Sequence, residues 1–219
     1  MRGVFVTGTG TEVGKTVVTA AIARTAAAAG QSVAVFKPAV SGLDDLNKGG
    51  EPDHELLRRA AGSKQSDEEI APYRFGPALS PHLAAALAGE QIHPEQLIRS
   101  ARAAAEAADC LVVEGVGGFL VPLSASYLVR DFARELGLPV VIAASPGLGT
   151  ISHTLLTIEA VRAAELQVKA VVLTPWPSEP EEIHYSNRET IAALGGVEVE
   201  TLPIIDLGRT ETWPALDLA

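Results

Sequence analysis

The 219-residue chain is long enough to bury a sizeable hydrophobic core, and its apolar content of 47% is ordinary for a globular protein. A formal net charge of −10 argues against a general nucleic-acid-binding protein, because such proteins need a basic face to neutralise phosphates. No apolar run approaches the roughly 18 residues needed to span a bilayer, and the first strand begins too early to leave room for a signal peptide. We therefore expect a soluble cytoplasmic protein. Its one cysteine, Cys110, cannot form an internal disulfide and is expected to be a buried strand residue.

Apolar, strand-forming runs alternate along the chain with helical stretches. Strands are predicted at 3–8, 32–38, 111–115, 138–145 and 168–174, and helices at 15–30, 53–61, 82–88, 94–108, 126–137, 151–165 and 181–194. The strands are nearly continuous apolar runs, as expected when helices cover both faces of a sheet. This alternation predicts an α/β fold with a doubly wound, mainly parallel sheet, formed as one domain over residues 1–219. Residues 38–52 are predicted to be a loop, and the tail after Pro203 to be irregular.

The stretch "GTGTEVGKT" (8–16) follows the first strand directly and opens the first helix. The strict phosphate-loop pattern, G-x-x-x-x-G-K-[ST], would place its first glycine at Thr9, whereas the glycine here is Gly8, one residue earlier. Glycines let the backbone turn its N–H groups inward, and the helix that follows directs its positive end at an anion. The alternative is a glycine-rich turn with a solvated lysine. The order of strand, loop and helix favours a phosphate site in a three-layer fold like that of the P-loop NTPases.

In such a loop, Lys15 would reach the β- and γ-phosphates of a nucleotide, and the Thr16 hydroxyl would ligate Mg²⁺. Lys37 and Glu114 each end a predicted strand, and ligands of open parallel sheets bind beyond these carboxyl ends. Lys37 could stabilise a phosphoryl group in transfer, or could be an ordinary solvated strand end. Glu114 ends a very apolar strand and needs a partner there, which could be Mg²⁺ or the cation of a buried salt bridge.

Three other features give less specific indications of function when they are judged from the residues alone. Asp53 could merely favour the N-terminus of a short helix. The stretch "SPGLGTISHTLL" (145–156) is predicted to be a flexible turn that leads into a helix, and its free N–H groups near Thr150–His153 could receive a carboxylate. The five histidines show no spacing that demands a transition-metal site.

Several motifs in order resemble the dethiobiotin synthetase family of biotin biosynthesis. They are "FVTGTGTEVGKT", "FKPAVSG", "SPH", "LVVEGVGG", "LPVVIAAS", "LGTISHTLLT" and "SNR", and they extend from residue 4 to about residue 194. The lengthened phosphate loop is itself a feature of that family. The resemblance implies an ATP- and Mg²⁺-dependent enzyme that closes a ureido ring from 7,8-diaminononanoate and CO₂, by way of a carbamate and a carbamic–phosphoric mixed anhydride. It also implies a homodimer with the substrate near the interface.

The resemblance assigns a role to each residue that matches a family motif. Lys15 and Lys37 would be catalytic, and Thr16, Asp53 and Glu114 would organise Mg²⁺. The nucleotide would be bound by Thr11, Glu12, Val13, Gly14, Lys15, Thr16, Val17, Glu114 and Thr174. The substrate would be bound by Thr11, Ser41, Gly117, Leu148, Gly149, Thr150 and Asn187, the last of which would reach the neighbouring subunit's site.

One position departs from the family pattern. Many members have an asparagine that reads adenine after the strand matching "VKAVVLT", where this chain has Thr174, followed by "PWP". A threonine cannot make the paired donor and acceptor contact of an amide, so we expect weaker discrimination between bases. Trp176 could stack nearby or simply pack in the loop.

Two other classes of P-loop protein share the opening strand, loop and helix. A dimeric switch ATPase of the partitioning or Min type would have an early lysine in its loop, whereas "TGTGTEVGKT" has none before Lys15. Nor is there a C-terminal basic amphipathic helix for membrane attachment. Amidotransferase-type ligases such as cobyric acid synthases carry a glutaminase domain, for which 219 residues leave no space.

Overall fold

A six-stranded sheet lies at the centre of the molecule. The computed structural model describes residues 1–48 and 51–219. The strands are all parallel and lie in the order β10-β9-β8-β1-β5-β2, which confirms the predicted doubly wound α/β fold. Their bounds are β1 (Gly3–Gly8), β2 (Val33–Phe36), β5 (Cys110–Glu114), β8 (Val140–Ala144), β9 (Val168–Trp176) and β10 (Val199–Pro203). Two small two-stranded sheets pair β3 (Ala39–Val40) with β4 (Tyr73–Arg74) and β6 (Pro122–Ser124) with β7 (Tyr127–Leu128).

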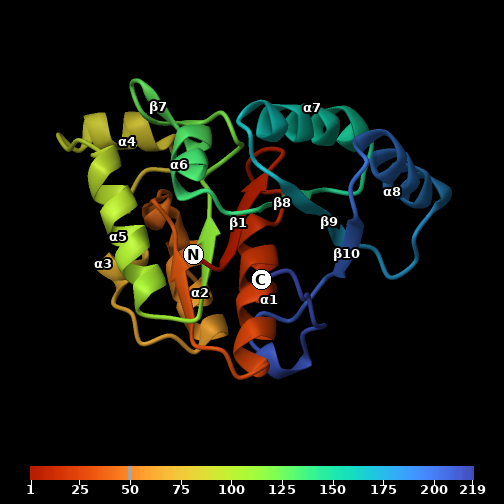
Figure 1. The fold of residues 1–219 in the computed structure, drawn as a ribbon, viewed down its shortest axis with the longest axis horizontal. Helices are drawn as coiled ribbons and strands as arrows, with labels where there is room; N and C mark the ends of the chain where they lie inside the picture. The colour runs from red at the N-terminus through yellow and green to blue at the C-terminus, as the bar shows by residue number, and fades with distance from the viewer. Residues whose placement is uncertain (49–50) are drawn as a thin grey trace.

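Helices cover both faces of this sheet (Figure 1). They are α1 (Lys15–Ala28), α2 (Asp53–Ala61), α3 (Asp67–Ile70), α4 (Pro81–Leu87), α5 (Pro94–Glu106), α6 (Val129–Leu136), α7 (Thr150–Ala163) and α8 (Glu182–Gly195), with 3₁₀ turns η1 (Leu43–Lys48) and η2 (Thr210–Thr212). Helices α1 and α2 contribute to one hydrophobic core, and α5 to α8 contribute to the other. The result is a three-layer arrangement.

Alternation along each strand explains why the strands are apolar throughout. In β1, Phe5 faces the core beneath α5 to α8, whereas its neighbours Val4 and Val6 face the core beneath α1. Phe5 meets Phe132 of α6 edge-on, with ring centroids 6.0 Å apart. A strand buried on both sides must therefore be apolar at nearly every position.

Strand β10 was not predicted from the sequence. It is an edge strand, and Glu200 and Thr201 are only half-buried, so it lacks the continuous apolar run of the inner strands. The tail beyond it contains one short 3₁₀ turn but is well packed: Trp213 and Leu216 are buried beneath the sheet with α1, and the Leu216 N–H donates to Thr25 Oγ1 at 2.9 Å.

Smaller differences lie at the ends of elements. The region 38–52, predicted to be a loop, contains β3 and η1, and residues 49–50 lie outside the described residues. The helix predicted at 126–137 is shorter because β7 takes residues 127–128. Cys110 is buried, as expected. In the part of the chain that the structure describes, no helix is long and apolar enough to cross a bilayer.

Candidate nucleotide and metal site

Strand order brings three separate stretches of the chain to one edge of the sheet. Strand β5 lies between β1 and β2, with Val6 opposite Glu114 and Phe36 opposite Val113. Because the three strands are parallel, the segments that follow them meet at their carboxyl ends. The phosphate loop, Lys37 and Glu114 are therefore neighbours in space.

The phosphate loop is shaped by two of its glycines. Gly14 precedes α1 with φ 86°, a left-handed conformation that favours glycine. A Cβ on Gly8 would lie 2.6 Å from the Val13 side chain, so a larger residue there would collide with the loop. Lys15, the first residue of α1, folds back so that its Nζ donates to the Gly10 carbonyl at 2.7 Å. The N-terminus of α1 thus opens onto the same space as the lysine ammonium.

Four side chains form a compact polar cluster beside this loop. Lys37 Nζ donates to Glu114 Oε1 at 2.6 Å and also forms an ion pair with Asp53. Thr16 Oγ1 lies 3.1 Å from Asp53 Oδ1 and 3.0 Å from Glu114 Oε1. Asp53 reaches the cluster because it is the first residue of α2, which packs along α1. The buried salt bridge considered for Glu114 therefore exists, and Lys37 is its cation.

Burial and charge act against each other in this cluster. Glu114 is fully buried and Lys37 is 4% exposed. Burial alone would lower the pKa of Lys37, but Glu114 and Asp53 outweigh it and raise that pKa. Burial raises the pKa of Glu114 despite the opposing charge of Lys37. For Asp53, burial would raise the pKa, and the Lys37 ammonium more than offsets it, so the pKa falls. Lys37 is accordingly held in its charged form.

The cluster offers oxygen atoms of the type that Mg²⁺ prefers. Glu114 Oε2 is buried and has no hydrogen-bond partner among residues 1–48 and 51–219. A buried carboxylate oxygen without a partner is costly, and a divalent cation would satisfy it. The Thr16 hydroxyl and the Asp53 carboxylate lie beside it and supply further hard ligands. The donor set therefore fits Mg²⁺.

A cavity of about 810 Å³ lies over this cluster at the carboxyl ends of the strands. Of the residues with a predicted role, it is lined by Thr11, Glu12, Gly14, Lys15, Thr16, Val17, Lys37, Ser41, Asp53, Glu114 and Gly117. Its volume lies in the range of small-molecule sites. Lys15 and Lys37 supply its positive charges, and Asp53, Glu114, Glu12 and Glu51 outnumber them with carboxylates. Such a cavity suits a phosphate ester that brings its own counter-cation.

Comparison with known proteins agrees with this geometry. The family model described as "AAA domain" matches residues 2–205. The ATP-dependent dethiobiotin synthetase BioD of Anaeromyxobacter dehalogenans (strain 2CP-1) is 45% identical over 89% of this chain and 86% of its own length. The enzyme of the same name from Bacillus subtilis (strain 168) is 36% identical over 91% of this chain and 85% of its own.

The chain belongs to the dethiobiotin synthetase family. This confirms the resemblance found in the motifs. Among solved structures, the cell division ATPase MinD of Pyrococcus furiosus superposes with a TM-score of 0.55 at 16% identity, covering 93% of this chain and 84% of that one. At that identity the likeness shows the P-loop NTPase fold alone, so it adds nothing to the Min-type alternative.

Some residues that the dethiobiotin synthetase motifs single out do not line the cavity. They are Val13, Leu148, Gly149, Thr150, Thr174 and Asn187. Leu148 is 93% exposed, in the turn between β8 and α7. Asn187 is buried, and its Nδ2 donates to the carbonyls of Pro146 and Gly147 at 2.9 and 3.1 Å. Within this chain, Asn187 therefore holds the turn in place.

Thr174 packs beneath the phosphate loop. It is 2% exposed, and a Cβ on Gly14 would lie 2.5 Å from its Cγ2 atom. Trp176 points its ring at α8, with His184 and Tyr185 at centroid distances of 5.9 and 6.0 Å. Trp176 thus packs against α8.

Sequence reasoning gave no role to several residues that line the cavity, among them Glu51, Ser80 and Leu207. Ser80 belongs to the quoted "SPH" motif, which was the available signal for it. Leu207 comes from the irregular tail, and no local pattern connects it to the phosphate loop.

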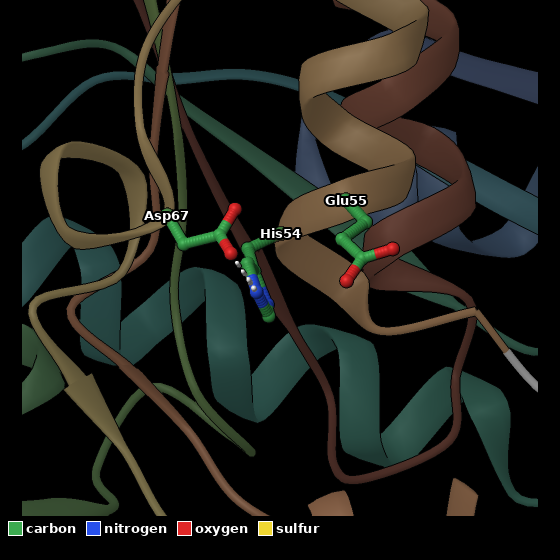
Figure 2. A group of neighbouring side chains, drawn as sticks. All are labelled: His54, Glu55 and Asp67. Atoms are coloured by element: carbon green, nitrogen blue, oxygen red, sulfur yellow. Dashed lines mark ion pairs between the residues drawn. The ribbon is translucent and has the colours of Figure 1, made fainter.

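A second group of potential metal ligands lies outside this cavity. His54, Glu55 and Asp67 offer atoms within 4.8 Å of one another, although the sequence spacing of the histidines suggested no such group (Figure 2). Asp67 already forms an ion pair with Arg58, and its other oxygen lies 3.9 Å from His54 Nε2. Because Arg58 neutralises this carboxylate, we assign no metal to the group.

Proposed function

We propose that this chain closes the ureido ring of dethiobiotin from 7,8-diaminononanoate and CO₂, with ATP as the phosphoryl donor. The observation that carries the proposal is the convergence of Lys15, Lys37, Thr16, Asp53 and Glu114 on one cavity. Phosphoryl transfer requires positioning and charge neutralisation rather than a covalent nucleophile, and these groups supply both. Membership of the dethiobiotin synthetase family supports the choice of substrate.

The reaction then proceeds in three balanced steps. One amine of the substrate adds to CO₂ and loses a proton, which gives a carbamate. A carbamate oxygen attacks the γ-phosphorus of ATP, and ADP leaves, which gives a carbamic–phosphoric mixed anhydride. The second amine attacks the carbamate carbon and releases a proton, the ring closes, and inorganic phosphate leaves with the electron pair of the broken C–O bond.

Different residues of the charged cluster would bind the reacting groups and the metal during phosphoryl transfer. Lys15 and Lys37 would hold the carbamate and the transferring phosphoryl group, because both ammonium groups line the cavity. Thr16, Asp53 and Glu114 would hold Mg²⁺. When bound, that ion neutralises charge on the β- and γ-phosphate oxygens. The backbone of the loop, from Thr11 to Val17, would bind the nucleotide phosphates, and Thr174 would lie on the base side.

The diamine would lie with its reacting end beside Thr11, Ser41 and Gly117, which line the cavity. Its distal carboxylate would be received at the N-terminus of α7, at Leu148, Gly149 and Thr150. Those residues do not line the cavity of their own chain, and Leu148 is 93% exposed. This supports a homodimer in which one subunit supplies the carboxylate site for its neighbour, with Asn187 near that interface.

The net charge of −10 and the family's substrates support a cytoplasmic enzyme that acts on small molecules, without a nucleic-acid or membrane partner. The experiment is incubation with 7,8-diaminononanoate, bicarbonate and MgATP, followed by mass spectrometry. We expect the ureido product, together with ADP and phosphate. Hydrolysis of ATP without a ureido product would contradict the proposal and favour a switch ATPase.

A further inference from the structure

A second cavity, of about 710 Å³, lies at the end of the sheet opposite the candidate site. Its lining residues belong to the start of β2, which is an edge strand, to the end of α2 with the turn that follows, and to the C-terminal half of α5 with the residues after it. One wall is formed by the alanines Ala103, Ala104, Ala107 and Ala108. The opposite wall is formed by β2 and by the turn that contains Ser63, Lys64 and Gln65.

The hydrogen bonds at the outer edge of β2 show which chemical groups can pair with its backbone. The ladder with β5 uses the backbone groups of Ser32 and Ala34, so those of Val33 and Val35 point away from the sheet. The Val35 N–H donates to Gln65 Oε1 at 2.9 Å, and Gln65 Nε2 donates to the Val35 carbonyl at 3.1 Å. One carboxamide, with its N–H and C=O on the same side, therefore satisfies both groups of an edge residue.

Val33 presents the same pair of groups two residues earlier, and it lines the cavity. Its N–H and C=O form no hydrogen bond with the residues that the structure describes. A ligand that copies the Gln65 carboxamide would fit here. An extended peptide would need two successive peptide units to supply this pair, whereas a primary carboxamide, a lactam or a cyclic urea supplies both from one group, as Gln65 does.

The other residues that line the cavity indicate which further groups a ligand would carry. The alanine wall offers a smooth apolar surface for an aliphatic body. Three charged side chains line the cavity: Lys64, Glu68 and Glu69. Glu68 pairs with Arg74 at 2.6 Å, and Glu69 accepts from the Ser66 N–H at 2.7 Å. Lys64 has no ion-pair partner in the described part of the chain, so it is available to a carboxylate.

We propose that this cavity binds a small molecule that combines a cis N–H and C=O group with an aliphatic chain and a carboxylate. The cis group would pair with Val33, the chain would lie along the alanines, and the carboxylate would meet Lys64. Dethiobiotin has all three features, and its choice as the natural ligand rests on the proposed function. The enzyme would then bind its own product at a site remote from the chemistry.

The test is amide NMR of the isotopically labelled protein titrated with dethiobiotin. We expect the Val33 amide signal to shift and saturate with dethiobiotin and with 2-imidazolidinone, which keeps only the cyclic urea. Heptanoate, which lacks the urea, should leave that signal in place. Lys64→Gln should weaken dethiobiotin but not 2-imidazolidinone.

Ala103→Trp fills the cavity from an exposed helix position, so the fold should be retained. It should weaken binding at Val33 by about ten-fold or more while leaving turnover unchanged. Ala193→Trp, at an exposed position of α8, is the matched control. A Val33 signal that does not respond, or a response indifferent to Ala103→Trp, would overturn the proposal. Turnover is measured separately. Ring closure without a Val33 response would overturn this proposal alone. A Val33 response to 2-imidazolidinone without ring closure would overturn only the proposed function.

Discussion

Lys37 Nζ lies 2.6 Å from Glu114 Oε1, and the two residues come from the ends of adjacent strands. The same ammonium pairs with Asp53. Lys37 therefore places one positive charge between the two carboxylates that would hold Mg²⁺ in the nucleotide complex. In the proposed function, binding of the metal and nucleotide would redistribute this charge and make the lysine available to the incoming phosphates.

Glu114→Gln removes one charge without changing the size of the side chain. We expect turnover to fall by about 100-fold or more, because stabilisation of several kcal/mol by the metal would be lost. The measurement is the steady-state rate as a function of Mg²⁺ concentration. Glu159→Gln, on the exposed side of α7, should behave like the unaltered protein. Equal activity of the two variants would remove Glu114 from the metal site.

Lys37→Met should cost stability as well as activity. It leaves Glu114 buried without its cation, and breaking a buried ion pair in this way typically costs about 3 kcal/mol or more. The double variant Lys37→Met, Glu114→Gln should regain part of that loss but no turnover. Urea unfolding of the single and double variants measures the free energies. If the double variant proves less stable than Lys37→Met, the pair is not coupled as described.

Base selection should be weak. Thr174 is buried beneath the phosphate loop and lacks the paired donor and acceptor of an asparagine amide. Because sites built to hydrogen-bond a group discriminate strongly and this one lacks the amide, kcat/KM for ATP, CTP and GTP should agree within about ten-fold. Initial rates with each nucleotide provide the comparison. A large preference for ATP would show that other groups read the base.

Asn187→Ala should affect the diamine and not the nucleotide. The two hydrogen bonds from Asn187 hold the carbonyls of Pro146 and Gly147, within the turn that would receive the substrate carboxylate. Their loss should raise KM for 7,8-diaminononanoate by about ten-fold and leave KM for ATP unchanged. Ser186→Ala, at an exposed neighbouring position on α8, is the control. A rise in both KM values would indicate a general structural defect instead.

The parts of the site that could be predicted are those tied to apolar strands. The phosphate loop, Lys37 and Glu114 each end a strand whose pattern is clear in the sequence, and parallel strands bring such ends together. The position of Asp53 depends on α2 packing against α1, a contact between distant segments that no local pattern reveals. From the residues alone, its simplest role was an ordinary helix start.

Three other features could not be predicted from the sequence, each for a different physical reason. Strand β10 lies at the sheet edge, and its two half-buried polar residues, Glu200 and Thr201, interrupt the apolar run by which the inner strands were predicted. Leu207 reaches the cavity from a tail without periodicity, although Trp213 and Leu216 anchor that tail in the core. The pairing of Gln65 with Val35 depends on where a turn meets a strand edge, and such a contact leaves no signature in the sequence.

A crystal structure with Mn²⁺ and a non-hydrolysable ATP analogue would test the proposed metal and nucleotide site directly. Manganese can be located by its anomalous scattering. We predict one ion coordinated by Thr16, Asp53 and Glu114, with the Lys15 and Lys37 ammonium groups at the terminal phosphate. A bound nucleotide whose metal makes no contact with Glu114, while Lys37 stays paired with that carboxylate, would contradict this prediction.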